Sequence, residues 1–104
     1  MSQAPNELNM PMPGNNSYSI EYLDTVVEKD IPALPKTMRL RIKTAIEERL
    51  TLDPVGFGKP LRYSLKGHRR LRVGDYRIVY RIEPHKHIVL ITAIKHRKDI
   101  YEAD

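Results

Sequence analysis

The residues of this sequence best suited to chemistry are cations on both sides of a tight-turn signal, Gly74-Asp75. Residues on either side alternate between apolar and basic types, which predicts two antiparallel strands joined at this pair. Such a hairpin pairs Arg72 with Arg77, and its side chains alternate between two faces. One face then collects five basic side chains, namely His68, Arg70, Arg72, Arg77 and Arg81.

This predicted basic face calls for a ligand. Like charges that lie opposite each other across two strands destabilise a sheet, and a bound anion removes that repulsion. Guanidinium groups match phosphate oxygens in geometry and charge, so a phosphodiester is the expected ligand. The alternative is a solvated basic face that binds nothing.

Further cations come near the end of the chain, at Lys95, His96, Arg97 and Lys98, followed by Tyr101. A last strand beside the hairpin would deliver them to one edge of the basic face. Alternation then points His96 away from Lys95 and Arg97. Tyr101 could stack on a nucleobase or could simply anchor the tail.

Composition sets the limits of this interpretation. The chain has 104 residues, no Cys and a net charge of +5, and residues 59–104 alone carry +7 against −2 for residues 1–58. We expect a single cytoplasmic domain without disulfides, since no apolar run reaches the ~18 residues of a membrane span and no secretory signal is present. No metal site or cofactor is predicted, because the four His lack acidic or Cys neighbours at metal-ligand spacing.

The pattern along the chain predicts an α+β fold. Residues 1–17 are Pro- and Asn-rich and are expected to be a disordered lead, followed by one domain over residues 18–104. A strand over 18–23 precedes a short helix over 24–30, with Asp24 as its N-cap and Val27, Ile31 and Leu34 at helical spacing. Pro32 interrupts this helix, and a second helix over 36–51 has one apolar stripe. That stripe consists of Leu34, Met38, Ile42, Ala45, Ile46 and Leu50.

The second half of the chain predicts a meander of strands. Gly and Pro residues indicate a flexible loop over 53–60, and a short strand is expected over 61–66. The hairpin strands follow over 69–73 and 76–83, and an apolar run over 87–94 predicts an interior strand covered on both faces. The apolar hairpin face is expected to pack on the helix stripe, and it consists of Leu71, Val73, Tyr76, Ile78 and Tyr80.

Three segments in this order resemble the RelE/ParE toxin superfamily of bacterial toxin–antitoxin systems: LPKTMRLRIKTAIEERL, FGKPLRYSLKGHRRLRVGDYRIVYRIE and AIKHRKDIY. The resemblance covers about residues 18–102. It implies a strand, two antiparallel helices and a mostly antiparallel sheet. It also implies one of two activities, either endoribonuclease cleavage of mRNA in the ribosomal A site or, in ParE-type members, poisoning of DNA gyrase.

Carried onto this chain, the family's ribonuclease site matches His68, Arg70, Arg77, Lys95, Arg97 and Tyr101. Further RNA contacts are expected from Arg72, Arg81, Lys66 and Lys98. Cleavage would need no metal: His68 is the expected base, because a histidine side chain titrates near neutral pH, and the arginines would stabilise the phosphate. The implied partners are the ribosome, mRNA and an antitoxin with an acidic and apolar segment. A gyrase inhibitor and an inactive RNA-binding module remain the alternatives, and the sequence leaves the oligomeric state open.

Overall fold

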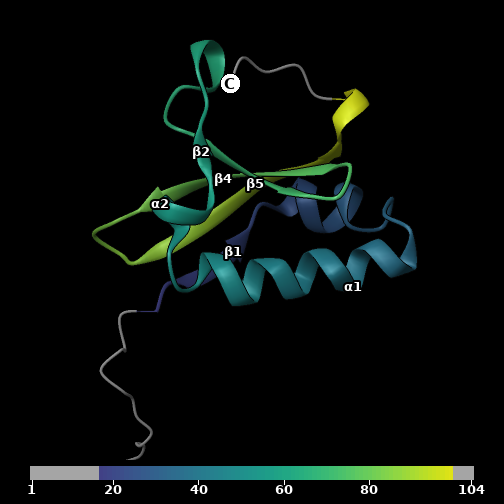
Figure 1. Ribbon diagram of the computed structural model, residues 1–104, viewed down its shortest axis with the longest axis horizontal. Helices are drawn as coiled ribbons and strands as arrows, with labels where there is room; N and C mark the ends of the chain where they lie inside the picture. Colours follow the sequence, from purple (N-terminus) through teal and green to yellow (C-terminus); the bar gives the residue numbers. More distant parts are fainter. Residues whose placement is uncertain (1–16, 100–104) are drawn as a thin grey trace, which may run out of the picture.

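A five-stranded sheet organises the chain, and helices pack on one of its faces (Figure 1). The computed structural model describes residues 17–99, so nearly all of the predicted lead over 1–17 and Tyr101 lie outside the described residues. The strand order is β1-β5-β4-β3-β2, with β1 parallel to β5 and the other pairs antiparallel. The strands are β1 Ser19–Tyr22, β2 Lys59–Pro60, β3 Arg69–Val73, β4 Tyr76–Glu83 and β5 Ile88–His96. The predicted α+β fold with a mostly antiparallel sheet is confirmed.

Both predicted helices are present. The first begins at Asp24 and continues as the π-helical η2, Val26–Asp30, and the second comprises α1, Lys36–Ala45, and the π-helical η3, Ile46–Leu50. Two details of the first helix were predicted wrongly. Asp24 is the first helical residue rather than the cap, because Leu23 supplies the carbonyl for the first turn. Val26 is fully buried while Val27 is 52% exposed, so the buried position of this helix lies one residue earlier than the predicted spacing places it.

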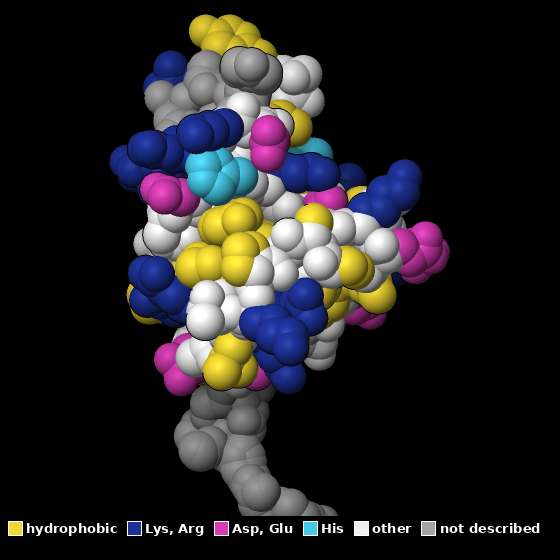
Figure 2. Space-filling view, turned by 90° about the vertical axis from the view of Figure 1, so that its right-hand side faces the viewer, with side chains coloured by type: hydrophobic (Ala, Val, Ile, Leu, Met, Phe, Trp, Pro, Cys, Tyr) yellow, Lys and Arg dark blue, Asp and Glu magenta, His cyan; other side chains and the backbone are white. Residues whose placement is uncertain are grey.

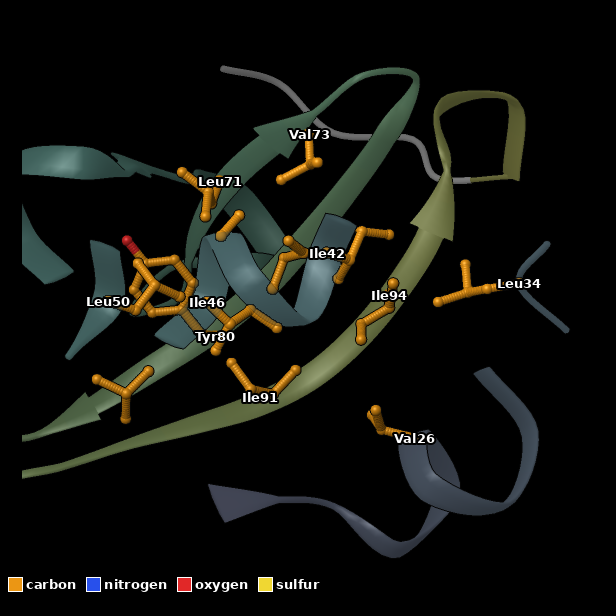
Figure 3. Close-up of a cluster of buried hydrophobic side chains, with 13 residues drawn as sticks. Val26, Leu34, Ile42, Ile46, Leu50, Leu71, Val73, Tyr80, Ile91 and Ile94 are labelled. Carbon is orange, nitrogen blue, oxygen red and sulfur yellow. The ribbon is translucent and has the colours of Figure 1, made fainter. Parts of the chain in front are cut away.

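The core lies between the helix stripe and the sheet (Figure 3). The stripe residues Ile42, Ala45, Ile46 and Leu50 are buried, as the spacing predicts, and Met38 packs against them. On the sheet side the buried side chains are Leu71, Val73, Ile78, Tyr80, Val89, Ile91 and Ile94. Because these apolar side chains point towards the helices, the side chains that alternate with them in the same strands point to the opposite face of the sheet.

The segment predicted as a flexible loop over 53–60 is ordered. It forms the short helix α2, Pro54–Phe57, whose N-cap Asp53 accepts the Gly56 amide at 2.9 Å. The buried Tyr80 hydroxyl donates to the Pro54 carbonyl at 2.6 Å. At Gly58 a Cβ atom would overlap that hydroxyl, so the close approach of the backbone requires glycine.

The strand predicted over 61–66 is not formed. Strand pairing stops at Pro60, opposite Arg69, and the Leu61 amide then donates to the His68 carbonyl at 2.9 Å. Between them the chain reverses through the 3₁₀ turn η4, Tyr63–Leu65, whose carbonyls and amides bond within the turn. Backbone groups used in this way are not available to a sheet ladder.

Strand β5 is an interior strand between β1 and β4, as its apolar run predicts, but it is not fully covered on both faces, since Ile88 and Leu90 on the face away from the helices are only half-buried. A bulge places Val79 opposite Ala93 but Tyr80 opposite Ile91, so Thr92 is an extra residue. The Thr92 hydroxyl donates to the Val79 carbonyl at 3.2 Å. Because of this extra residue, Val89, Ile91 and Ile94 all face the helices despite their uneven spacing.

Candidate functional site

The basic face of the hairpin forms with the predicted register. Arg72 pairs with Arg77, Leu71 with Ile78 and Arg70 with Val79. The predicted pairing of His68 with Arg81 is not part of the ladder, because β3 begins at Arg69. Neither α1 nor η3 lies on this face, and from it rise the short 3₁₀ turns η4 and η5, Arg97–Asp99 (Figure 1).

A cross-strand row of cations lies near the hairpin turn. Arg72 pairs with Arg77, and Arg77 pairs on its other side with Lys95 of β5. Paired residues in neighbouring strands point to the same face, so the last strand does run beside the hairpin as predicted. From the end that carries the β3–β4 turn, Figure 2 shows Lys and Arg side chains on both sides of a His in its upper part.

Three of the predicted cations surround one hollow at the end of the hairpin. It has a volume of about 140 Å³ and is lined by Arg72, Gly74, Asp75, Tyr76, Arg77 and Arg97. Three guanidinium groups against one carboxylate give the hollow a net positive charge. Such a group of fork-shaped donors is suited to an oxyanion such as a phosphate.

Asp75 holds the C-terminal segment at this hollow. Its carbonyl accepts the Arg97 amide at 2.8 Å, and its carboxylate Oδ1 lies 3.7 Å from Arg97 Nε. Gly74 supplies the left-handed backbone of the turn, with φ of 60°. The turn therefore brings Arg97, from η5 (Arg97–Asp99), next to Arg77 of β4.

Lys95 does not line the hollow and has a different partner. Its Nζ lies 2.7 Å from Oδ1 of Asp30, the last residue of η2. Oδ2 of the same carboxylate accepts the backbone amide of Ile94 at 2.9 Å. Asp30 is only 7% exposed, so it serves both as a buried cap for the free edge of β5 and as the counter-ion of Lys95.

The other predicted residues of the face are spread along the strands. Arg70 is 5% exposed, and Arg81 bonds to Glu83 at 3.2 Å. His68 lies four residues before Arg72, roughly 13 Å along an extended strand. His68 is half-buried, and its Nδ1 is buried without a hydrogen-bond partner among the described residues.

The remaining predicted cations lie at two ends of the molecule. Lys66 is exposed in the connection between β2 and β3, and Lys98 is exposed in η5. His96 packs edge-on against Tyr76, with ring centroids 5.2 Å apart, which confirms that it points away from Lys95. Its Nδ1 accepts the Lys98 amide at 3.2 Å.

Sequence reasoning found the cations but missed the acids that hold them. Asp30 and Asp75 each fix one of the C-terminal cations, and Lys59 adds a further cation opposite Arg70. Asp75 was recognised only as a turn residue. Nothing near Asp30 in the sequence points to Lys95, which follows 65 residues later.

Residues 17–99 contain neither a metal-ligand cluster nor a membrane-spanning helix. No cluster of three or more His or acidic residues there could hold a metal ion. No helix in that range has the length and apolar character needed to cross a membrane.

The fold and the cluster of arginines together define a class of protein, a small α+β domain with a basic site on the face of its sheet away from α1. Residues 22–101 match the family model described as the ParE toxin of the type II toxin–antitoxin system parDE. This match covers most of the chain. The chain therefore belongs to the ParE toxin family, within the RelE/ParE superfamily of type II toxins.

Individual relatives agree with this assignment. Toxin RelG of Mycobacterium tuberculosis is 33% identical over 84 residues, which cover 81% of this chain and 95% of RelG. Toxin RelE of the same organism is 36% identical over 73 residues, covering 70% of this chain and 75% of that protein. Among solved structures, the toxin–antitoxin complex RelBE2 from Mycobacterium tuberculosis matches with a TM-score of 0.73 and 31% identity. That match covers 78% of this chain and 99% of the other.

Proposed function

We propose that this toxin is an endoribonuclease that cleaves mRNA on the ribosome. The observation that carries the proposal is the hollow where Arg72, Arg77 and Arg97 meet, because three guanidinium groups at one point suit a phosphodiester. The relatives named RelG and RelE support the RelE type of activity. In this proposal the arginines hold the phosphate that reacts.

The proposed reaction is an internal phosphoryl transfer that uses no metal ion. A base removes the proton of a ribose 2′-hydroxyl, and the 2′-oxygen forms a bond to the adjacent phosphorus. The bond from phosphorus to the 5′-oxygen breaks, and an acid protonates that oxygen. The products are a 2′,3′-cyclic phosphate, which water can open to a 3′-phosphate, and a 5′-hydroxyl. Arg77 and its neighbours stabilise the negative charge that builds on the phosphate oxygens.

His68 is the proposed base. It lies roughly 13 Å along the strand from Arg72, so this role requires the reacting phosphate to lie between the hollow and His68, within reach of the long Arg72 and Arg77 side chains. The surroundings of the ring set a second condition. To accept a proton at Nε2, the neutral ring must carry its own proton on Nδ1, which is buried and lacks an acceptor among the described residues. That tautomer costs free energy, because a buried donor would be left unpaired. Loss of His68 should slow cleavage strongly and remove the pH dependence that a general base gives to the rate.

The remaining proposed roles follow from position. Arg81, together with Lys66 and Lys98, contacts the RNA backbone along the face, and Tyr101 stacks on a base. Arg70 is 5% exposed, so its proposed role is to add positive charge at the phosphate from within the sheet. Lys95 acts close to Asp30, which neutralises part of its charge. The site is open, so we propose that the ribosome positions the mRNA. The protein would then act in the cytoplasm.

We further propose a cognate antitoxin as the regulating partner. The RelBE2 structure from Mycobacterium tuberculosis and the RelB–RelE structure from Methanococcus jannaschii are both toxin–antitoxin complexes. The second is 28% identical, with a TM-score of 0.62. An acidic and apolar antitoxin segment would complement the +7 charge of residues 59–104, and its binding should weaken with salt.

Inhibition of DNA gyrase is the second candidate function. It is favoured by the family model itself, which describes a ParE toxin. This activity would need the same fold but no arrangement of groups around a scissile phosphate. The two functions therefore differ in their response to loss of Arg77.

Arg77→Ala provides the decisive experiment. We expect mRNA cleavage on purified ribosomes to fall by about 10²–10³, and growth inhibition to disappear, because one preorganised donor to the transition state is lost. Arg49→Ala is the matched control, since it removes the same charge from the helical layer, at an exposed position. Supercoiling by gyrase is measured in parallel. A wild-type protein that inhibits gyrase, together with a fully toxic Arg77→Ala, would replace the ribonuclease by the second candidate.

A further inference from the structure

Tyr63 is an aromatic side chain held out into solvent by an unusual backbone. It is 77% exposed, and its φ is 57°, in the left-handed region that bulky residues rarely adopt. Among residues 17–99 only one other residue besides glycine, His87, has a positive φ. A left-handed conformation at such a residue is unfavourable and persists only where the surroundings impose it.

The turn around Tyr63 imposes that conformation without using the ring. The Tyr63 carbonyl accepts the Lys66 amide at 3.0 Å, and the Arg62 carbonyl accepts the Leu65 amide at 3.1 Å. The His68 amide donates to the Leu65 carbonyl at 2.9 Å, which closes the turn. Within the described part of the chain, the Tyr63 side chain has neither a hydrogen bond nor an aromatic partner. The fold therefore fixes the backbone of Tyr63 and leaves its ring uncovered.

The turn that carries Tyr63 lies on the same side of the sheet as the basic face. The connection from β2 to β3 rises from the sheet on the side opposite α1 (Figure 1). The segment η5, which carries Arg97, rises on the same side at the other end of the hairpin (Figure 1). The arginine hollow and Tyr63 thus stand at opposite ends of one face, with Arg70 on the strand between them.

The neighbours of Tyr63 have the chemistry of a nucleic-acid contact. Arg62 and Lys66 are exposed on either side of it in the turn, and Ser64 is an exposed hydroxyl next to it. Proteins that bind single-stranded nucleic acid combine cations for the backbone with aromatic rings on which bases stack. Stacking needs an exposed ring on an anchored backbone, and the left-handed turn provides both.

We propose that Tyr63 is a stacking platform for a base of single-stranded RNA that lies beyond the phosphate held by Arg72, Arg77 and Arg97. This inference rests on the proposed ribonuclease function and adds a second contact point to the same site. The RNA would run along the basic face from the hollow to the turn. Tyr63 then sets the register of the RNA relative to the reacting phosphate, and it is a positioning residue rather than a catalytic one.

Tyr63→Asn removes the aromatic ring and preserves the left-handed backbone of the turn. Asparagine tolerates the left-handed region, so this variant keeps the turn and should melt at or above the wild-type temperature. Tyr63→Phe keeps the ring and should behave like wild type. Phe57→Asn is the control, because Phe57 is an aromatic residue 50% exposed on α2.

Binding is measured with a 12-nucleotide RNA, uniformly 2′-O-methylated so that it cannot be cleaved, by fluorescence anisotropy. We expect Tyr63→Asn to raise Kd about 5- to 100-fold, the range typical of one stacked base, while Tyr63→Phe and Phe57→Asn change it less than twofold. On ribosomes the same variant should shift the positions of mRNA cleavage, whereas a purely structural change would lower cleavage at every position alike.

The same RNA is then prepared as a set in which each member lacks one base, at a different position. Removing the base that stacks on Tyr63 should weaken binding to wild type but not to Tyr63→Asn, so the two losses are not additive. If the wild type binds and cleaves RNA but no abasic position shows this coupling, the stacking role is overturned and the proposed function stands. A wild type that neither binds this RNA nor cleaves mRNA on ribosomes would overturn both.

Discussion

Asp30→Ala tests whether a buried carboxylate holds the edge of the sheet beside the site. In the folded protein the Ile94 amide and the Lys95 ammonium both donate to Asp30, at 2.9 and 2.7 Å. Truncation leaves the buried amide without an acceptor, at a cost of about 1–3 kcal/mol. The ion pair adds at most about 1 kcal/mol, because the Lys95 side chain is 44% exposed and solvent screens it. We therefore expect the free energy of unfolding to fall by about 1–4 kcal/mol.

The assay is urea unfolding in an Arg77→Ala background, so that the toxin can be produced without its proposed activity. Asp30→Asn separates the two contributions, since its amide oxygen can still accept from Ile94 while the charge is gone. It should cost about 1 kcal/mol, and Lys95→Gln should add little to it in a double-mutant cycle. An Asp30→Ala protein within about 0.5 kcal/mol of its parent would refute the role given to this carboxylate.

Two further predictions concern the core. Ile42→Asp should destabilise the fold by several kcal/mol, because it places an unpaired charge in the layer between α1 and the sheet; an unchanged melting temperature would show that this face of α1 is not the buried one. Burial raises the pKa of Tyr80 above 10.0, against an opposing effect of Arg69, so the folded state retains the phenol proton more tightly than the unfolded state. The contribution of Tyr80 to stability should then be fully present below pH 10 and be lost as the pH rises through the folded pKa. Tyr80→Phe should cost about 1–3 kcal/mol at neutral pH, because the Pro54 carbonyl loses its donor. Urea unfolding from pH 7 to 11 should show a shallower alkaline loss in this variant, to which Tyr22, whose pKa burial also raises, still contributes.

Local periodicity explains what the sequence could predict. The register around Gly74-Asp75 and the stripe of α1 each depend on residues within one turn or one hairpin. Spacing alone therefore identified Arg72 and Arg77 as neighbours and Ile42 as a core residue. These predictions needed no knowledge of distant contacts.

The features that were missed depend on partners far away in the sequence. α2 is held by Tyr80, 26 residues from its contact Pro54, and Asp30 meets Ile94 across 64 residues. A Gly- and Pro-rich segment reads locally as flexible, and only the approach of Tyr80 shows why Gly58 must be there. In the site the same limit applies, because a list of cations does not show which acid turns Lys95 away from the hollow.

The extra residue in β5 also determines how this strand can vary. Thr92 divides the strand into a segment whose core positions are Val89 and Ile91 and a segment whose core position is Ile94. Deleting it would restore simple alternation, with Ile94 still towards the helices and Lys95 still towards the basic face. The bulge therefore sets the local twist and direction of the terminal segment and not which of its residues are inside. A chain that lacks Thr92 should fold with Ile94 in the core, whereas deleting Ile94 would bring Lys95 to that core position and should prevent folding.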